Sequence, residues 1–103
     1  MKLKKRIYRK KEKEYTMYFV TFSAKHSGVL SRFKELHNIE IITGKNRIVL
    51  PKANLFKNSY YVDRKTVQKI PLYSFVVPKN IGEELEKNGI KKLKVIVELP
   101  ELN

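Results

Sequence analysis

Hydrophobic and polar residues alternate in short blocks from residue 15 onwards. The first block, residues 15–22, is rich in aromatic and β-branched residues and predicts a strand. Similar blocks recur along the chain, with turn residues at 44–46 and a charged turn at 64–65 between neighbouring blocks. The predicted strands cover residues 15–22, 39–43, 47–50, 59–63, 66–70, 72–77 and 91–99.

Two segments have helical spacing instead. Leu30, Phe33, Leu36 and His37 fall three and four residues apart after a polar break at 23–28, and Ser27 or Ser31 could cap this helix. Asn38 suits the left-handed residue that follows a helix end.

The second helix is predicted over residues 80–88. Asn80 and Glu83 have the spacing of a capping box, and Gly89 is the expected stop. The whole pattern predicts an α+β fold, a small mostly-β domain with two short helices.

Prolines are expected to interrupt several of these elements. Pro51 and Pro78 would each end a strand, and Pro71 should break the ladder or lie at a sheet edge. Residues 52–58 would form at most a helical turn or two.

Length and composition narrow the protein class. The 103 residues are enough for one domain, and the apolar runs are far too short to cross a bilayer, so no membrane insertion is expected. The chain has no cysteine, which excludes disulfides and thiolate zinc sites and fits a cytoplasmic location.

The charge is concentrated at the N-terminus. The net charge is +13, and residues 1–13 hold eight basic residues and one acidic residue, a net charge of +7. Such a block repels itself and lacks a core, so we predict a disordered, flexible basic arm over 1–13 and a single α+β domain over 14–103.

A dense basic arm favours a polyanionic partner, because lysine and arginine neutralise phosphates and release counterions. A solvated terminus and a short amphipathic helix on an anionic membrane surface are the alternatives. The predicted nucleic-acid-binding residues are Lys2, Lys4, Lys5, Arg6, Arg9, Lys10, Lys11 and Lys13 in the arm, Lys45, Arg47 and Lys52 near one hairpin, and Arg64 and Lys65 in another turn.

Tyr60 and Tyr61 are candidate base-stacking residues. Neighbours on a strand point to opposite faces, so one of them could be exposed beside Arg64 and Lys65. We favour the alternative, in which one tyrosine packs in the core and the other covers it.

A short pattern occurs twice, at 48–52 and 75–79, as apolar-Val-apolar-Pro-Lys. The second copy continues through a short helix, Gly89 and an alternating basic strand. This layout over residues 67–99, and more loosely 41–62, resembles AbrB/MazE-like swapped-hairpin domains. The resemblance implies an intertwined homodimer or a pseudo-dimer, barrel-like in form, with DNA lying across an exposed basic hairpin that contains Arg47.

The sequence contains no recognisable catalytic motif. His26 and His37 fit no metal-site spacing, and Glu83, Glu84 and Glu86 are more typical of a solvated helix face than of an acid–base pair. We therefore expect neither enzymatic activity nor a cofactor.

The leading hypothesis is a non-enzymatic nucleic-acid-binding protein, a regulator or architectural protein that binds double-stranded DNA through phosphate contacts. RNA binding in a ribonucleoprotein is the first alternative. The second is an inhibitor or adaptor whose basic surface covers an acidic protein partner.

Overall fold

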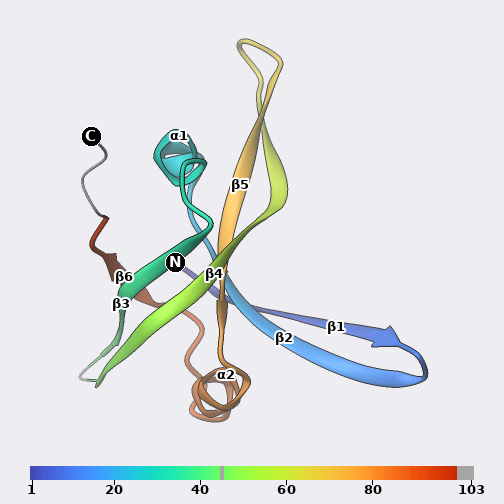
Figure 1. Cartoon of the computed structure of the whole chain (residues 1–103), viewed down its shortest axis with the longest axis vertical. Helices are drawn as coiled ribbons and strands as arrows, with labels where there is room; N and C mark the ends of the chain where they lie inside the picture. The colour runs from blue at the N-terminus through green and yellow to red at the C-terminus, as the bar shows by residue number, and fades with distance from the viewer. Residues whose placement is uncertain (45, 100–103) are drawn as a thin grey trace.

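The computed structural model describes residues 1–44 and 46–99 and arranges them as a six-stranded antiparallel sheet with two short α-helices (Figure 1). The strands are β1 (Leu3–Lys10), β2 (Lys13–Thr21), β3 (Glu35–Thr43), β4 (Asn46–Asp63), β5 (Gln68–Val77) and β6 (Lys94–Val97), and the helices are η1 (Ala24–His26), α1 (Ser27–Leu30) and α2 (Lys79–Lys87). The predicted mostly-β fold with two short helices is confirmed, whereas a closed barrel is not seen.

The strand order is β1-β2-β5-β4-β3-β6, and the long strand β4 joins the two halves of the sheet. β4 pairs with β3 as far as Asn54 and with β5 from Leu55 onwards. Both halves and both α-helices contribute to one core. Its buried residues are Tyr18, Val20, Leu30, Leu36, Ile39, Ile41, Leu50, Ala53, Phe75, Val77, Leu85 and Leu93.

The first half of the sheet has only one face on this core. Tyr18 and Val20 of β2 point into the core, so Phe19 between them points to the other face. Phe19 is 4% exposed but lies outside the core cluster. α2 packs on the core face, where Gly82 lies directly against the Tyr18 side chain.

The flexible arm predicted for residues 1–13 is not what the structure shows. Leu3–Lys10 form β1, which pairs with β2 along its whole length, from Leu3 opposite Val20 to Lys10 opposite Lys13. Backbone hydrogen bonds in this hairpin outweigh the charge repulsion on which the prediction was based.

The helix predicted through Leu36 and His37 is also wrong beyond Leu30. α1 has only four residues, and Leu36 and His37 lie in β3. Asn38 does have a positive φ of 51°, but within the strand, where it faces Pro51 across the ladder. Because of this left-handed residue, the buried residue after Leu36 is Ile39, three positions later instead of two. This spacing of three resembles the spacing of buried residues in a helix.

The prolines interrupt less than expected. β4 continues through Pro51 and residues 52–58, which form strand rather than a helical turn. Pro71 lies within β5, on a stretch that pairs with β4 alone. It therefore occupies a sheet edge, which is one of the two positions predicted for it.

The C-terminal elements follow the predicted order. α2 occupies the predicted helix and Gly89 has the expected positive φ of 72°, but the N-cap is Pro78 and makes no side-chain cap hydrogen bond, so the capping box is not formed. β6 is shorter than the predicted strand. Among the described residues, no helix has the length and apolar character needed to span a membrane.

Candidate nucleic-acid interface

The β1–β2 hairpin extends beyond the sheet as a two-stranded ribbon. β2 pairs with β5 only over Tyr18–Thr21, so residues 6–17, here called the ribbon, have no third strand beside them in the described structure. Figure 1 shows the ribbon projecting away from both helices. Five paired residues on each strand give it a length of about 17 Å.

The ribbon ends in a two-residue turn at Lys11 and Glu12. Both residues have positive φ, 51° and 65°, as a type I′ turn requires. This turn matches the right-handed twist of the flanking strands, although Asn-Gly is the usual sequence for it. Lys11 and Glu12 thus fix the register of the basic hairpin, although neither residue type favours the positive φ of this turn.

One face of the β1–β2 hairpin, along the ribbon and at its base, carries cations together with large side chains. Residues two apart on a strand share a face, and paired residues of β1 and β2 share it as well. This set, here called the ribbon face, consists of Lys4, Arg6, Tyr8, Lys10, Lys13, Tyr15 and Met17. Within residues 1–44 and 46–99, none of its four cations lies within ion-pair distance of a carboxylate.

The opposite face of the hairpin differs, because both of its cations have acidic partners. Lys5 Nζ donates to Glu86 Oε1 of α2 at 3.0 Å, and Arg9 Nε lies 3.8 Å from Glu14 Oε2. The hydrogen bond to Glu86 raises the pKa of Lys5, although desolvation opposes it. The hairpin therefore has a neutralised face and a cationic face.

The end of the ribbon face places like charges together. Lys10 and Lys13 are directly opposite each other in the ladder. Like charges at such a pair destabilise a hairpin, by an amount within the range of roughly 0.2–1 kcal/mol seen for cross-strand pairs. A bound anion would remove this repulsion, so the local electrostatics favour a polyanionic ligand.

Further lysines gather at the base of the hairpin. The start of the chain pairs with the segment before β6: Lys2 bridges Lys92, and Leu3 N donates to Lys91 O at 3.0 Å. A hollow of about 500 Å³ lies at this junction, between β1 and the end of α2. Its lining residues are Lys2, Leu3, Lys4, Lys5, Tyr18, Glu86, Gly89, Ile90, Lys91 and Lys92.

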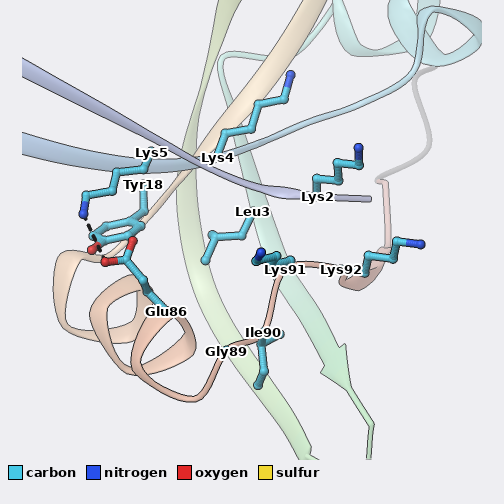
Figure 2. Close-up of a pocket in the computed structure, with 10 residues that line it drawn as sticks. All are labelled: Lys2, Leu3, Lys4, Lys5, Tyr18, Glu86, Gly89, Ile90, Lys91 and Lys92. Carbon is cyan, nitrogen blue, oxygen red and sulfur yellow. Dashed lines mark hydrogen bonds and ion pairs between the residues drawn. The ribbon is translucent and has the colours of Figure 1, made fainter.

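Figure 2 shows how these lysines are divided. Lys2 and Lys4 extend to the same side, away from α2, while Lys5 turns toward Glu86. Four of the five lysines around the hollow have no carboxylate within ion-pair distance among the described residues; Lys5 is the exception. The ribbon face thus continues at its base into a second basic surface.

The remaining predicted cations do not join this surface. Arg47 pairs with Glu40, and Lys52 Nζ lies 3.0 Å from Glu35 Oε2, both on the β3–β4 hairpin. Arg64 and Lys65 form part of the β4–β5 turn. The strands of the β1–β2, β3–β4 and β4–β5 hairpins extend in different directions in Figure 1. Lys45 lies outside the described residues.

The eight cations of the predicted arm do not all lie on one surface, because neighbouring residues of a strand point to opposite faces. Arg6, Lys10 and Lys13 share the ribbon face with Lys4, and Figure 2 shows Lys2 beside Lys4. Arg9 and Lys5 lie on the opposite face, and Lys11 lies in the turn.

Tyr60 and Tyr61 are both exposed, by 57% and 52%. The favoured prediction, in which one of them packs in the core, is therefore wrong. They lie on the protruding end of the β4–β5 hairpin, where β4 pairs with β5 alone.

Four residues of the basic surface were missed by sequence reasoning. Lys91 and Lys92 come next to the ribbon only through the chain-terminal bridge, which no local pattern reveals. Tyr8 and Tyr15 belong to the ribbon face, and their rings stack with centroids 5.5 Å apart. The two-residue alternation Lys4, Arg6, Tyr8, Lys10 was the available signal.

The histidines take no part in this surface. His26 ends η1, and His37 lies in β3 with its Nε2 atom 3.1 Å from Glu35 Oε1. His37 does not belong to a helix, because the helix predicted through it stops at Leu30.

Comparisons with protein-family models, with curated proteins and with solved structures find no match for this chain. The order strand, Pro78, helix, Gly89, strand that underlies the resemblance to AbrB/MazE-like domains is present as β5, α2 and β6. The family resemblance itself stays a prediction.

Proposed function

We propose that this protein is a non-enzymatic nucleic-acid-binding protein whose β1–β2 ribbon binds double-stranded DNA. The observation that carries the proposal is the asymmetry of the hairpin. Lys5 and Arg9 on one face are paired with carboxylates, whereas Lys4, Arg6, Lys10 and Lys13 on the ribbon face have no carboxylate within ion-pair distance among the described residues. Cations arranged in this way are available for phosphates.

The shape of the ribbon supports duplex DNA as the ligand. The major groove is about 12 Å wide and admits a two-stranded β-ribbon. Two strands of five paired residues, with no third strand along either edge in the part of the chain that the structure describes, meet this requirement. The lysines at the base of the hairpin would then contact the phosphates beside the groove and fix the orientation of the fold. Regulation or DNA packaging is the use we infer.

RNA is the alternative ligand, favoured by the exposed tyrosine pair on the ribbon face. An acidic protein partner is the second alternative and would also be attracted to this basic surface. The binding experiment below includes duplex DNA and structured RNA, so it tests whether nucleic acid is the partner at all.

The test compares two double variants of the full chain by fluorescence anisotropy with a labelled 20-base-pair duplex at several salt concentrations. Lys10→Gln with Lys13→Gln removes two charges from the ribbon face and relieves their mutual repulsion, so the fold should be retained. Lys79→Gln with Lys87→Gln removes two charges from α2 and is the matched control.

Each lost phosphate contact reduces the slope of log affinity against log salt by about 0.9, so the ribbon variant should lose about 1.8 and the control almost nothing. Equal losses in both variants would show that binding depends on net charge and not on the ribbon. Wild-type affinity weaker than about 100 micromolar for duplex DNA and for structured RNA would reject nucleic-acid binding altogether.

A further inference from the structure

The ribbon face contains an exposed aromatic pair. Tyr8 and Tyr15 are cross-strand partners whose rings stack with an interplanar angle of 21°. They remain 46% and 41% exposed, so the stack leaves part of each ring open to solvent. Such rings on an uncovered strand pair are apolar surface without a partner in the described structure.

Cations flank this pair on both sides along the ribbon. Lys10 and Lys13 are the next pair toward the turn, and Arg6 precedes Tyr8 on the same face. The Arg6 guanidinium lies 5.4 Å from the centroid of the Phe19 ring, and its Nη2 atom donates to Asn58 Oδ1 at 2.7 Å. Arg6 is thus held in place beside the tyrosines.

The same side of the sheet carries a buried aromatic ring at the base of the ribbon. Phe19 follows Met17 on the ribbon-face side of β2 and is only 4% exposed, and its ring meets Phe56 of β4 edge-on with the centroids 6.0 Å apart. The rings open to solvent on the ribbon are therefore those of Tyr8 and Tyr15, and cations lie on both sides of them.

We propose that Tyr8 and Tyr15 stack on unpaired bases, so that the preferred ligand is a duplex that contains a short unpaired segment. This inference rests on the proposed nucleic-acid-binding function and deepens it. Base–aromatic stacking does not depend on base identity, because every base has a π-face, and cations beside the rings neutralise the adjoining phosphates. The ribbon face supplies both kinds of contact, without a carboxylate among its residues.

A second copy of this chain is a poorer occupant of the same face. A two-fold dimer brings the same surface patch of each copy together. Here that arrangement would place Lys10 and Lys13 of one copy near the cations of the other, and like charges across an interface oppose binding. A negatively charged strand has the complementary charge.

The experiment uses two DNA probes with equal numbers of phosphates, so that electrostatic attraction is nearly the same for both. One is a continuous 20-base-pair duplex, and the other has four central mismatches that leave its bases unpaired. The full-length wild type is compared with Tyr8→Leu/Tyr15→Leu. Tyr60→Leu serves as the control, since it removes a tyrosine of similar exposure from another hairpin.

We expect the wild type to bind the mismatched probe about tenfold more tightly than the continuous duplex, as one or two base stacks provide. The Tyr8→Leu/Tyr15→Leu variant should lose this preference and bind both probes with equal affinity. Tyr60→Leu should retain the tenfold preference. Matching RNA probes reveal whether the unpaired bases come from DNA or RNA.

Three results would overturn the inference while leaving duplex binding intact. The wild type could bind both probes with equal affinity, or its preference for the mismatched probe could survive the loss of Tyr8 and Tyr15. In the third, Tyr60→Leu would reduce this preference as much as Tyr8→Leu/Tyr15→Leu does. Sedimentation of the free proteins adds a fourth, a wild-type dimer that becomes monomeric in Tyr8→Leu/Tyr15→Leu. Failure of the wild type to bind either probe would instead reject the proposed function. Urea unfolding of the variant checks that its fold is retained.

Discussion

The packing of α2 on β2 makes a sharp prediction for Gly82. A β-carbon at this position would lie 2.5 Å from Tyr18 Cδ2 and 2.7 Å from Tyr18 Cβ, and closer still to Cγ. Tyr18 is 3% exposed, so its ring has no free space into which it can move. Gly82→Ala must therefore displace either the helix or the strand at the base of the ribbon.

The expected cost combines two opposing effects. Overpacking a core costs about 1–3 kcal/mol, while alanine in place of glycine within a helix contributes about 1 kcal/mol of stability. Because the contacts involve the buried base of the Tyr18 ring, we expect the upper part of the overpacking range, about 2–3 kcal/mol, which leaves a net destabilisation of about 1–2 kcal/mol. At about 1 kcal/mol per molar urea, the unfolding midpoint falls by roughly 1–2 M with an unchanged slope.

Gly28→Ala is the matched control, because a β-carbon on Gly28 in α1 would meet nothing within 4 Å among the described residues. This variant should be as stable as the wild type or slightly more stable. Tight packing of Gly82 against Tyr18 would be disproved if Gly82→Ala unfolded at the wild-type urea concentration, or if both alanine variants shifted the midpoint equally.

Two further predictions concern the turn of the ribbon and an ion pair of the β3–β4 hairpin. Lys11→Asn with Glu12→Gly supplies residues that suit the positive φ of the type I′ turn. The double variant should be more stable by about 1 kcal/mol in urea unfolding, and amide exchange in the ribbon should be slower. Unchanged exchange would contradict the turn assignment. The hydrogen bond from Lys52 lowers the pKa of Glu35, so this ion pair stabilises the fold above the usual glutamate range and is lost as pH falls through the lowered pKa. NMR titration should show that pKa rising in Lys52→Gln, and an unshifted pKa would exclude the pair.

The elements that could be predicted from the sequence are those whose conformation is determined by residues close by in the chain. The strand at 15–22, the helix at 80–88 and the Gly89 stop follow from neighbouring residues and were predicted correctly within a few residues. β3 was partly mistaken for a helix because Asn38, which has a positive φ within the strand, interrupts its alternation.

The ribbon shows why charge density alone is a poor guide to disorder. Lys11-Glu12 lacks the usual residues of a type I′ turn, so no hairpin signal marks residues 3–21. Yet the two-residue alternation from Lys4 to Lys10 is that of a strand with a cationic face. Residues 1–13 were correctly identified as the most basic segment, but their face could be recognised only from the pairing with β2.

The base of the interface was beyond reach of the sequence for a different reason. Lys91 and Lys92 join Lys2 through a contact between the two ends of the described chain. The need for a glycine at position 82 likewise comes from its contact with Tyr18, more than sixty residues earlier in the chain. Pairing between distant segments, which a single sequence does not encode locally, determines both features.

The most direct test of the central claim, that the ribbon face contacts nucleic acid, is an NMR titration of the full chain with the 20-base-pair duplex. If the ribbon face contacts DNA, the largest amide shifts fall in residues 4–17, with smaller shifts at Lys91 and Lys92 at the base of the hairpin. Shifts confined to the Arg64–Lys65 turn or to the β3–β4 hairpin, with the ribbon unchanged at saturating DNA, would contradict it.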